Sequence, residues 1–155
     1  MALQLSRHPA TPVIVGESDT SRVVALENPV LVVAGGSPVV PYTLGTPIIY
    51  PTVVKDSTGS YNPATGQFTC PKDGMYQITA AVGCDVGDSS EMYANINGVT
   101  VSGVLSVSQA GGVFPSGITI TPLLVGQVLT VRSNAGFTIS DSTRSLLTIL
   151  RVSDL

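Results

Sequence analysis

The sequence has few charged residues, few aromatic residues and no tryptophan. Only 11% of its 155 residues are charged and 5% are aromatic, whereas 43% are hydrophobic. In a typical soluble domain about a quarter of the residues are charged. A soluble monomer needs more charge than this to cover its surface, so the composition indicates a chain that buries part of its outside against other subunits. An unusually apolar monomer is the alternative.

Long apolar runs and clusters of basic residues are also missing. Gly, Pro, Ser or Thr interrupts every apolar stretch before it approaches the roughly 18–20 residues that span a bilayer. We therefore expect no membrane partner. The seven Lys and Arg are scattered among ten Asp and Glu, and the net charge is −3. Because no basic stripe exists to neutralise phosphates, we also expect no nucleic-acid partner.

A secretory signal and paired cysteines would indicate an oxidising compartment, and the sequence shows little of either. Its first residues lack the charged start, apolar centre and small-residue cleavage site of a signal peptide, so we expect synthesis in a cytoplasm. Cys70 and Cys84 are too few for a disulfide scaffold. We expect them on neighbouring strands as buried free thiols, with a disulfide between them as the alternative. No CxxC spacing is present to build a zinc site.

Residues for catalysis are scarce. The only histidine, His8, lies near the N-terminus, and a nucleophile–histidine device would have to recruit it from there. The carboxylates of Asp85, Asp88, Glu91 and Asp141 fall in expected loops, and their spacing matches no calcium-loop pattern. We therefore predict no enzyme activity and no cofactor. Asp85, Asp88 and Glu91 are kept as calcium candidates, with a solvated loop as the default interpretation.

Glycine and proline divide the chain into short pieces. Sixteen Gly and eleven Pro are spread from end to end, and the windows between them are rich in Val, Ile and Thr. This pattern predicts an all-β sandwich or barrel. The sequence Asn97-Gly98 is the clearest hairpin signal. The expected strands are residues 48–54, 67–69, 75–82, 91–96, 98–104, 117–121, 127–133, 137–140 and 145–152.

We expect two regions along the chain. Residues 1–44 would form an extended arm, because their apolar pieces are short and end at a Gly- and Pro-rich joint near residues 35–38. Residues 45–155 would form the head domain. An arm of this kind cannot bury its own apolar side chains and must dock on another surface. The candidate docking residues are Val13, Ile14, Val15, Val23, Val24, Leu26, Leu31 and Val32.

Two expected strands are apolar on both faces. In residues 145–152, Leu147 and Ile149 point one way while Leu146 and Leu150 point the other, so both faces must be covered. One face packs on the second sheet of a sandwich, and a neighbouring subunit is the simplest cover for the other. Residues 75–82 alternate in the same way. The candidate residues for a subunit interface are Met75, Thr79, Ala81, Leu147 and Ile149.

The run from residue 61 to residue 76, Tyr-Asn-Pro-Ala-Thr-Gly-Gln-Phe-Thr-Cys-Pro-Lys-Asp-Gly-Met-Tyr, resembles a known motif. It is similar to the run that joins two strands in the globular heads of complement C1q and the tumour necrosis factor (TNF) superfamily. Residues 93–98 and 126–131 resemble later strands of that family in the same order. The resemblance implies a two-sheet antiparallel jelly roll of ten strands, packed as a three-fold homotrimer.

These features together predict a structural task. We expect a trimeric capsid decoration (cement) protein or short head fibre of a tailed phage, made in the host cytoplasm and located in the virion. Its partners would be two further copies of itself and the major capsid protein or another virion protein. The alternative is a trimeric recognition module that binds a glycan or a protein receptor through its loops, including the tip of a tail fibre.

Overall fold

The computed structural model describes residues 30–36, 41–84, 91–107, 116–134 and 136–155, which form eleven strands and no helix. None of these residues therefore lies in a helix that could cross a membrane. Along the chain the strands are β1 (Leu31–Gly35), β2 (Pro41–Tyr42), β3 (Thr52–Asp56), β4 (Tyr61–Asn62), β5 (Gln67–Thr69), β6 (Gly74–Cys84), β7 (Glu91–Ile96), β8 (Val99–Val107), β9 (Ser116–Leu123), β10 (Val128–Ser133) and β11 (Phe137–Ser153).

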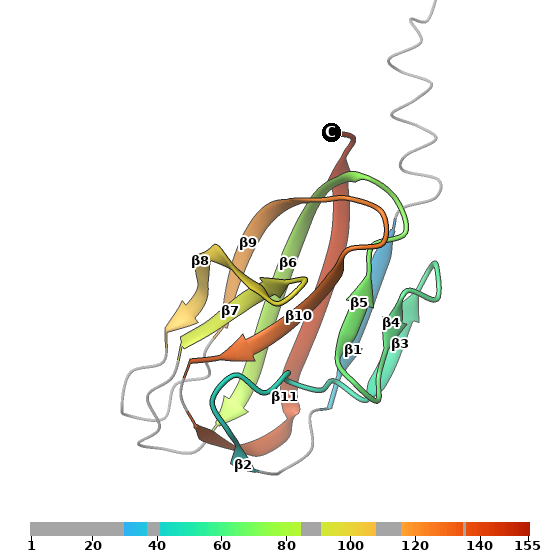
Figure 1. The fold of residues 1–155 in the computed structure, drawn as a ribbon. Coiled ribbons are helices and arrows are strands. Elements are labelled where there is room, and N and C mark those ends of the chain that lie inside the picture. The colour runs from blue at the N-terminus through green and yellow to red at the C-terminus, as the bar shows by residue number, and fades with distance from the viewer. Residues whose placement is uncertain (1–29, 37–40, 85–90, 108–115, 135) are drawn as a thin grey trace, which may run out of the picture.

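The strands form two antiparallel sheets that pack face to face (Figure 1). The six-stranded sheet has the order β3-β1-β11-β6-β9, with β2 paired to one end of β11. The five-stranded sheet has the order β4-β5-β10-β7-β8. All pairs are antiparallel, and neighbours in the sheets are often distant in sequence. This arrangement confirms the predicted all-β jelly roll, with eleven strands in the described residues instead of the ten implied.

The core lies between the two sheets, and the motif at residues 61–76 supplies its aromatic part. Tyr61, Phe68 and Tyr76 are buried, and the rings of Phe68 and Tyr76 lie 5.8 Å apart at an angle of 59°, a favourable tilted geometry. The Tyr76 hydroxyl reaches the edge of the core and donates to the carbonyl of Lys72 at 2.6 Å. The motif thus specifies the packing of the sandwich.

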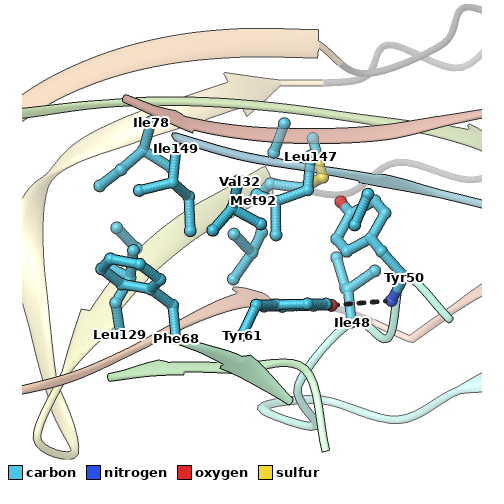
Figure 2. Packing of buried hydrophobic residues seen from close by; sticks show 14 of the residues in the cluster. Val32, Ile48, Tyr50, Tyr61, Phe68, Ile78, Met92, Leu129, Leu147 and Ile149 are labelled. Atoms are coloured by element: carbon cyan, nitrogen blue, oxygen red, sulfur yellow. Dashed lines mark hydrogen bonds between the residues drawn. The ribbon is translucent and has the colours of Figure 1, made fainter. Parts of the chain in front are cut away.

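Tyrosine hydroxyls also replace missing sheet partners in the segment before β3. Ile48 and Tyr50 are buried and Ile49 is partly buried, but none of the three belongs to a strand. Backbone N–H groups that are withdrawn from water need acceptors. The N–H of Tyr50 donates to the Tyr61 hydroxyl at 3.1 Å (Figure 2), and that of Ile49 donates to the Tyr42 hydroxyl at 3.4 Å. The N–H of Ile48 bonds to the carbonyl of Val131 at 2.8 Å. Three different side-chain and backbone acceptors therefore hold this segment inside the core.

Most predicted strands are confirmed, and the differences have local causes. Residues 67–69 and 91–96 match β5 and β7, and Asn97 with Gly98 turns the β7–β8 hairpin at positive φ values of 50° and 85°. The strand expected at residues 48–54 begins only at Thr52, because the segment before it turns into the core. The two strands expected at 137–140 and 145–152 are one strand, β11, which continues through irregular pairing near Asp141.

The predicted boundary between arm and head is wrong. Strand β1 pairs with both β11 and β3, and β2 pairs with β11, so the domain already includes residues 31–42. Val32 is fully buried in the core, and Leu31 is partly buried beside Leu150. Val32 is therefore not free to dock elsewhere, and Leu31 belongs to a strand of the domain, which corrects their assignment to the arm. The other docking candidates, Val13, Ile14, Val15, Val23, Val24 and Leu26, lie outside the described residues.

The two cysteines do not lie opposite each other. Cys70 is a buried free thiol whose Sγ contacts the Lys72 carbonyl at 3.2 Å. Cys84 ends the eleven-residue strand β6, which places it roughly 33 Å from Gly74. The four Cα–Cα steps from Cys70 to Gly74 recover at most about 14 Å of that length. A disulfide needs Cα atoms within about 7 Å, so the geometry excludes this pair.

Gly66 closes the turn between β4 and β5, where both its backbone angle and its surroundings favour glycine. Its φ is +69°, and a Cβ there would meet the carbonyl oxygen of Ile48 at 2.6 Å. Gly59 has a similar φ of +65° but nothing within 4 Å of the corresponding position. A comparison of substitutions at these two glycines therefore separates the cost of backbone strain from the cost of steric overlap.

We expect Gly66→Ala to destabilise the fold more than Gly59→Ala. The control change carries only the cost of a left-handed non-glycine residue, about 1 kcal/mol, whereas Gly66→Ala must also displace the Ile48 backbone. Urea unfolding followed by circular dichroism gives the two free energies of unfolding. Equal losses in the two variants would contradict the packing described here.

Asp56 organises the turn that follows β3. Its Oδ1 accepts from the N–H of Thr58 at 3.1 Å, and its Oδ2 accepts from the N–H of Tyr61 at 2.9 Å. Partial burial by itself would raise the pKa of this carboxyl. The N–H groups of Tyr61, Thr58, Ser60 and Gly59 outweigh that effect and hold the pKa below its usual value of 3.8, since hydrogen bonds to the charged form stabilise it.

Because the pKa of Asp56 is lowered in the fold, its contribution is fully present above the unfolded value and is lost as the pH falls through the lower folded value. We expect Asp56→Asn to be less stable than the parent at pH 7. The gap should narrow once the pH drops below about 3.8. Melting temperatures of both proteins across this range test the prediction, and a gap that does not change with pH would refute it.

Candidate functional site: the outward face of the six-stranded sheet

The side of the six-stranded sheet that points away from the core is mainly apolar across its central strands, with Lys55 of the edge strand β3 opposite Val33. Alternation along each strand determines which side chains lie there, because neighbouring residues point to opposite faces. Three of these side chains are strongly exposed: Ile118 at 58%, Ile120 at 56% and Leu146 at 43%. The outward residues are Leu31, Val33, Met75, Gln77, Thr79, Ala81, Ile118, Ile120, Pro122, Leu146, Thr148 and Leu150.

The strand register gathers these residues into rows across the sheet. Thr148 of β11 pairs with Thr79 of β6, which pairs with Ile118 of β9. The next row places Gln77 between Leu150 and Ile120. Large exposed apolar surfaces on soluble proteins mark contacts with other molecules. We refer to the twelve outward residues named above as the apolar face.

The structure corrects part of the predicted interface. Leu147 and Ile149 are only 2% and 1% exposed and belong to the core, so they cannot contact a neighbouring subunit. The residues of β11 on the apolar face are instead the alternate set that includes Leu146 and Leu150. Met75, Thr79 and Ala81 do lie on the apolar face and are partly buried. Whether they contact another subunit stays a prediction.

Ile118 and Ile120, the most exposed aliphatic side chains of the apolar face, were not among the predicted interface residues. In β9 the isoleucines point outward, while the alternate set ending in Thr121 and Leu123 points into the core. Ordinary patterning would predict the reverse for this stretch, with threonine outside. The available signal was the alternation itself, which separates the two sets without stating which one faces the core.

The outward side of the five-stranded sheet is different in character. Its central strands place Tyr93 and Asn95 of β7 opposite Arg132 and Thr130 of β10, and Gln67 of β5 is exposed. One face of the sandwich is thus polar and carries Arg132 on a central strand, while the other face is mainly apolar and carries Lys55 at its β3 edge. This asymmetry gives the domain two surfaces with different binding properties.

The structure brings together no catalytic or metal-binding group in the part of the chain that it describes. No cluster of three His, Cys, Asp or Glu forms among those residues. Asp85, Asp88 and His8 lie outside them. Glu91 begins β7, and only its backbone is described. The calcium candidates therefore stay predictions.

A hollow of about 460 Å³ lies at the end of the sandwich where β11 finishes. Asp73 and Asp154 line it, but both carboxylates are engaged. Asp73 Oδ1 accepts from the N–H of Val125 at 2.6 Å, and Asp154 forms an ion pair with Arg151. The Arg151 guanidinium is the main reason that the pKa of Asp154 lies below its usual value. Neither group is placed to act as a general base at neutral pH.

A family model provides the identification. The model described as the C1q domain matches residues 33–145, which include the motif, the five-stranded sheet and most of the six-stranded sheet before the second half of β11. The chain belongs to the C1q domain family. A search of curated proteins found no match for this C1q domain.

Solved structures agree on the fold. The globular domain of zebrafish complement 1qA has a TM-score of 0.55 and 16% identity, covering 77% of this chain and 92% of its own. Murine APRIL at pH 5.0 has a TM-score of 0.60 and 14% identity, covering 79% and 99%. The Eiger TNF of S. frugiperda has a TM-score of 0.58 and 15% identity, covering 83% and 95%. At these identities the likeness establishes a C1q/TNF-like jelly roll and nothing finer.

We expect the apolar face of this C1q domain to mediate self-association. Ile120→Asp places a charge at a side chain that is 56% exposed in the single chain, so the fold should survive while association weakens. Val99→Asp is the matched control, because Val99 is 69% exposed and begins β8 of the five-stranded sheet, away from the apolar face.

Light scattering after size-exclusion chromatography measures the oligomeric mass of all three proteins. The parent and Val99→Asp should share one oligomeric mass, and Ile120→Asp should shift toward the monomer at micromolar concentration. Burial of a charge without a partner costs several kcal/mol, enough to dissociate a moderately stable complex. A parent that is monomeric, or an Ile120→Asp variant with unchanged mass, would show that the apolar face is not an interface.

Proposed function

We propose that this C1q domain is a homotrimer that serves as a non-enzymatic structural part of a virion. In this role it is a capsid decoration (cement) protein or short head fibre of a tailed phage, made in the host cytoplasm. The apolar face is the observation that supports the proposal most directly, because a sheet face that exposes several large apolar side chains needs a permanent cover. Two further copies around a common axis supply that cover for each subunit.

In the proposed role one end of the head domain docks and the other faces outward, and the direction of the strands supports this assignment. Residue 30 enters beside the end of β11, where the Arg151 N–H donates to the Val30 carbonyl at 2.9 Å. Strands β6, β8 and β10 finish at the opposite end, with Cys84 beside Ile139 and Ser133 beside Met92. In the proposed role the segment before residue 30 docks on the shell, while the opposite end faces outward.

Docking by three copies of an apolar segment does not require a strong single contact. Segments joined through one trimer act at a high effective concentration, so the second and third contacts form more easily than the first. The preceding 29 residues include the two apolar groups Val13–Val15 and Val23–Leu26. The partner surface in this proposal is the major capsid protein or another protein of the virion.

A recognition module is the second candidate function, and the polar outward side of the five-stranded sheet favours it. A trimer that buries its apolar face leaves this polar side, with Arg132 and Tyr93, exposed to ligands. A glycan or a protein receptor is the expected partner in that case. The two candidates share the trimer and differ in the surface that carries the function.

The virion role predicts that the protein is a stoichiometric component of purified particles of the virus that encodes it. Quantitative mass spectrometry of those particles measures the ratio of the chain to the major capsid protein. A chain without residues 1–29 should keep the parent's oligomeric mass in solution and be lost from particles. Particles that lack the parent protein would end the virion proposal and leave the recognition module.

A further inference from the structure

Gln77 is the one carboxamide side chain of the apolar face. It belongs to β6, which lies between β11 and β9 in the six-stranded sheet (Figure 1). In the strand register Leu150 of β11 lies on one side of it and Ile120 of β9 on the other. Met75 and Thr79, its alternate neighbours along β6, point to the same side of the sheet. A polar group therefore lies in the middle of a mainly apolar surface.

Charged side chains lie at a distance from this area. Lys55 belongs to the edge strand β3, and three strand-to-strand steps separate β3 from β6, which amounts to about 14 Å. Asp73 precedes Gln77, and Arg144 precedes Leu150, by enough residues to lie roughly 13 Å or more along the chain direction. Interfaces between subunits carry few charges at their centre and are polar at their rim. The arrangement therefore indicates that the area around Gln77 is the centre of a contact and the β3 edge is its rim.

The Gln77 amide has hydrogen-bonding capacity that the single chain does not use. The residue is partly buried, and its side chain forms no hydrogen bond within the described residues. A carboxamide offers two N–H donors and one acceptor oxygen. A subunit that covers the apolar face removes water from this amide, and a polar group that loses water without gaining a partner weakens the contact. A stable contact therefore has to supply a hydrogen-bond partner at this position.

We propose that the Gln77 amides of three copies meet at the three-fold axis and form a closed ring of hydrogen bonds. At such an axis each residue meets its own copies, so a polar group there has to pair with itself. Each amide donates an N–H to the next amide and accepts one from the previous amide, which three like charges cannot do. The ring selects three subunits in one register, because a polar group in an apolar interface disfavours arrangements that leave it unpaired. This inference rests on the trimer proposed above and adds the residue that sets its number and register.

Disulfide crosslinking of Gln77→Cys in the full-length protein tests the position of the axis. A disulfide needs Cα atoms within about 7 Å, which the same residue in different copies reaches only close to the axis. Mild oxidation and a non-reducing denaturing gel should show crosslinked dimers. These should hold at most about two thirds of the chains, because the third copy has no partner.

Leu146→Cys is the matched control on the same apolar face. Leu146 lies four residues from Leu150 along β11, and therefore roughly 13 Å from Gln77, so its three copies are too far apart to pair. The parent protein gives the background from Cys70 and Cys84. A trimeric parent whose Gln77→Cys variant forms no more dimer than Leu146→Cys would overturn the inference and leave the trimer intact. A monomeric parent would instead end both the trimer and the ring.

Gln77→Leu tests whether the amides set the number of subunits. Leucine fills a similar volume without polar groups, so the variant should still associate but lose the penalty against other arrangements. Native mass spectrometry should show only trimers for the parent and a mixture of oligomers for Gln77→Leu. Circular dichroism checks that the variant is folded. A folded Gln77→Leu protein with a single trimeric mass would show that the amides do not select the number of subunits.

Discussion

The rest of the structure depends on one constraint: the six-stranded sheet has to be covered on both sides. At its centre, β11 sends Leu147 and Ile149 into the core and Leu146 and Leu150 to the opposite face. The five-stranded sheet covers the first pair but cannot reach the second. The low charge of the chain has the same origin, because surface that is destined for burial in an assembly has no need of charged residues. The need to cover both faces of this sheet therefore explains the low charge, the alternation of side chains in β11 and the packing of the two sheets.

Much of the fold was predictable because its determinants are local in sequence. The Asn97-Gly98 turn needs two residues that tolerate positive φ, and the motif places Phe68 and Tyr76 where their rings meet. Signals of this kind act over a few residues and can be recognised without knowledge of the tertiary structure. The all-β class followed from a signal of the same local kind, the Gly and Pro residues that divide the chain into short pieces rich in Val, Ile and Thr.

The parts that could not be predicted depend on partners far away in the chain. In the sequence alone, residues 31–35 look like part of an arm. In the structure they pair with residues of β11 that come more than a hundred positions later in the chain. Alternation in β11 and β9 separates two sets of side chains, but only the position of the second sheet decides which set is inside. For this reason the prediction placed Leu147 on the wrong face and did not include Ile118 among the interface residues. The polar pairs Tyr93–Arg132 and Asn95–Thr130 were missed because they combine β7 with β10, which no local pattern connects.

The position of β11 has a consequence for biosynthesis. This seventeen-residue strand lies between β1 and β6, near the middle of the six-stranded sheet, although it is the last strand of the domain to leave the ribosome. Until it emerges, β1 and β6 lack a common neighbour and the sandwich cannot close. Folding must therefore follow translation of the whole domain. Until β11 has been synthesised, the apolar strands stay exposed, so nascent chains have to be kept from aggregating with one another.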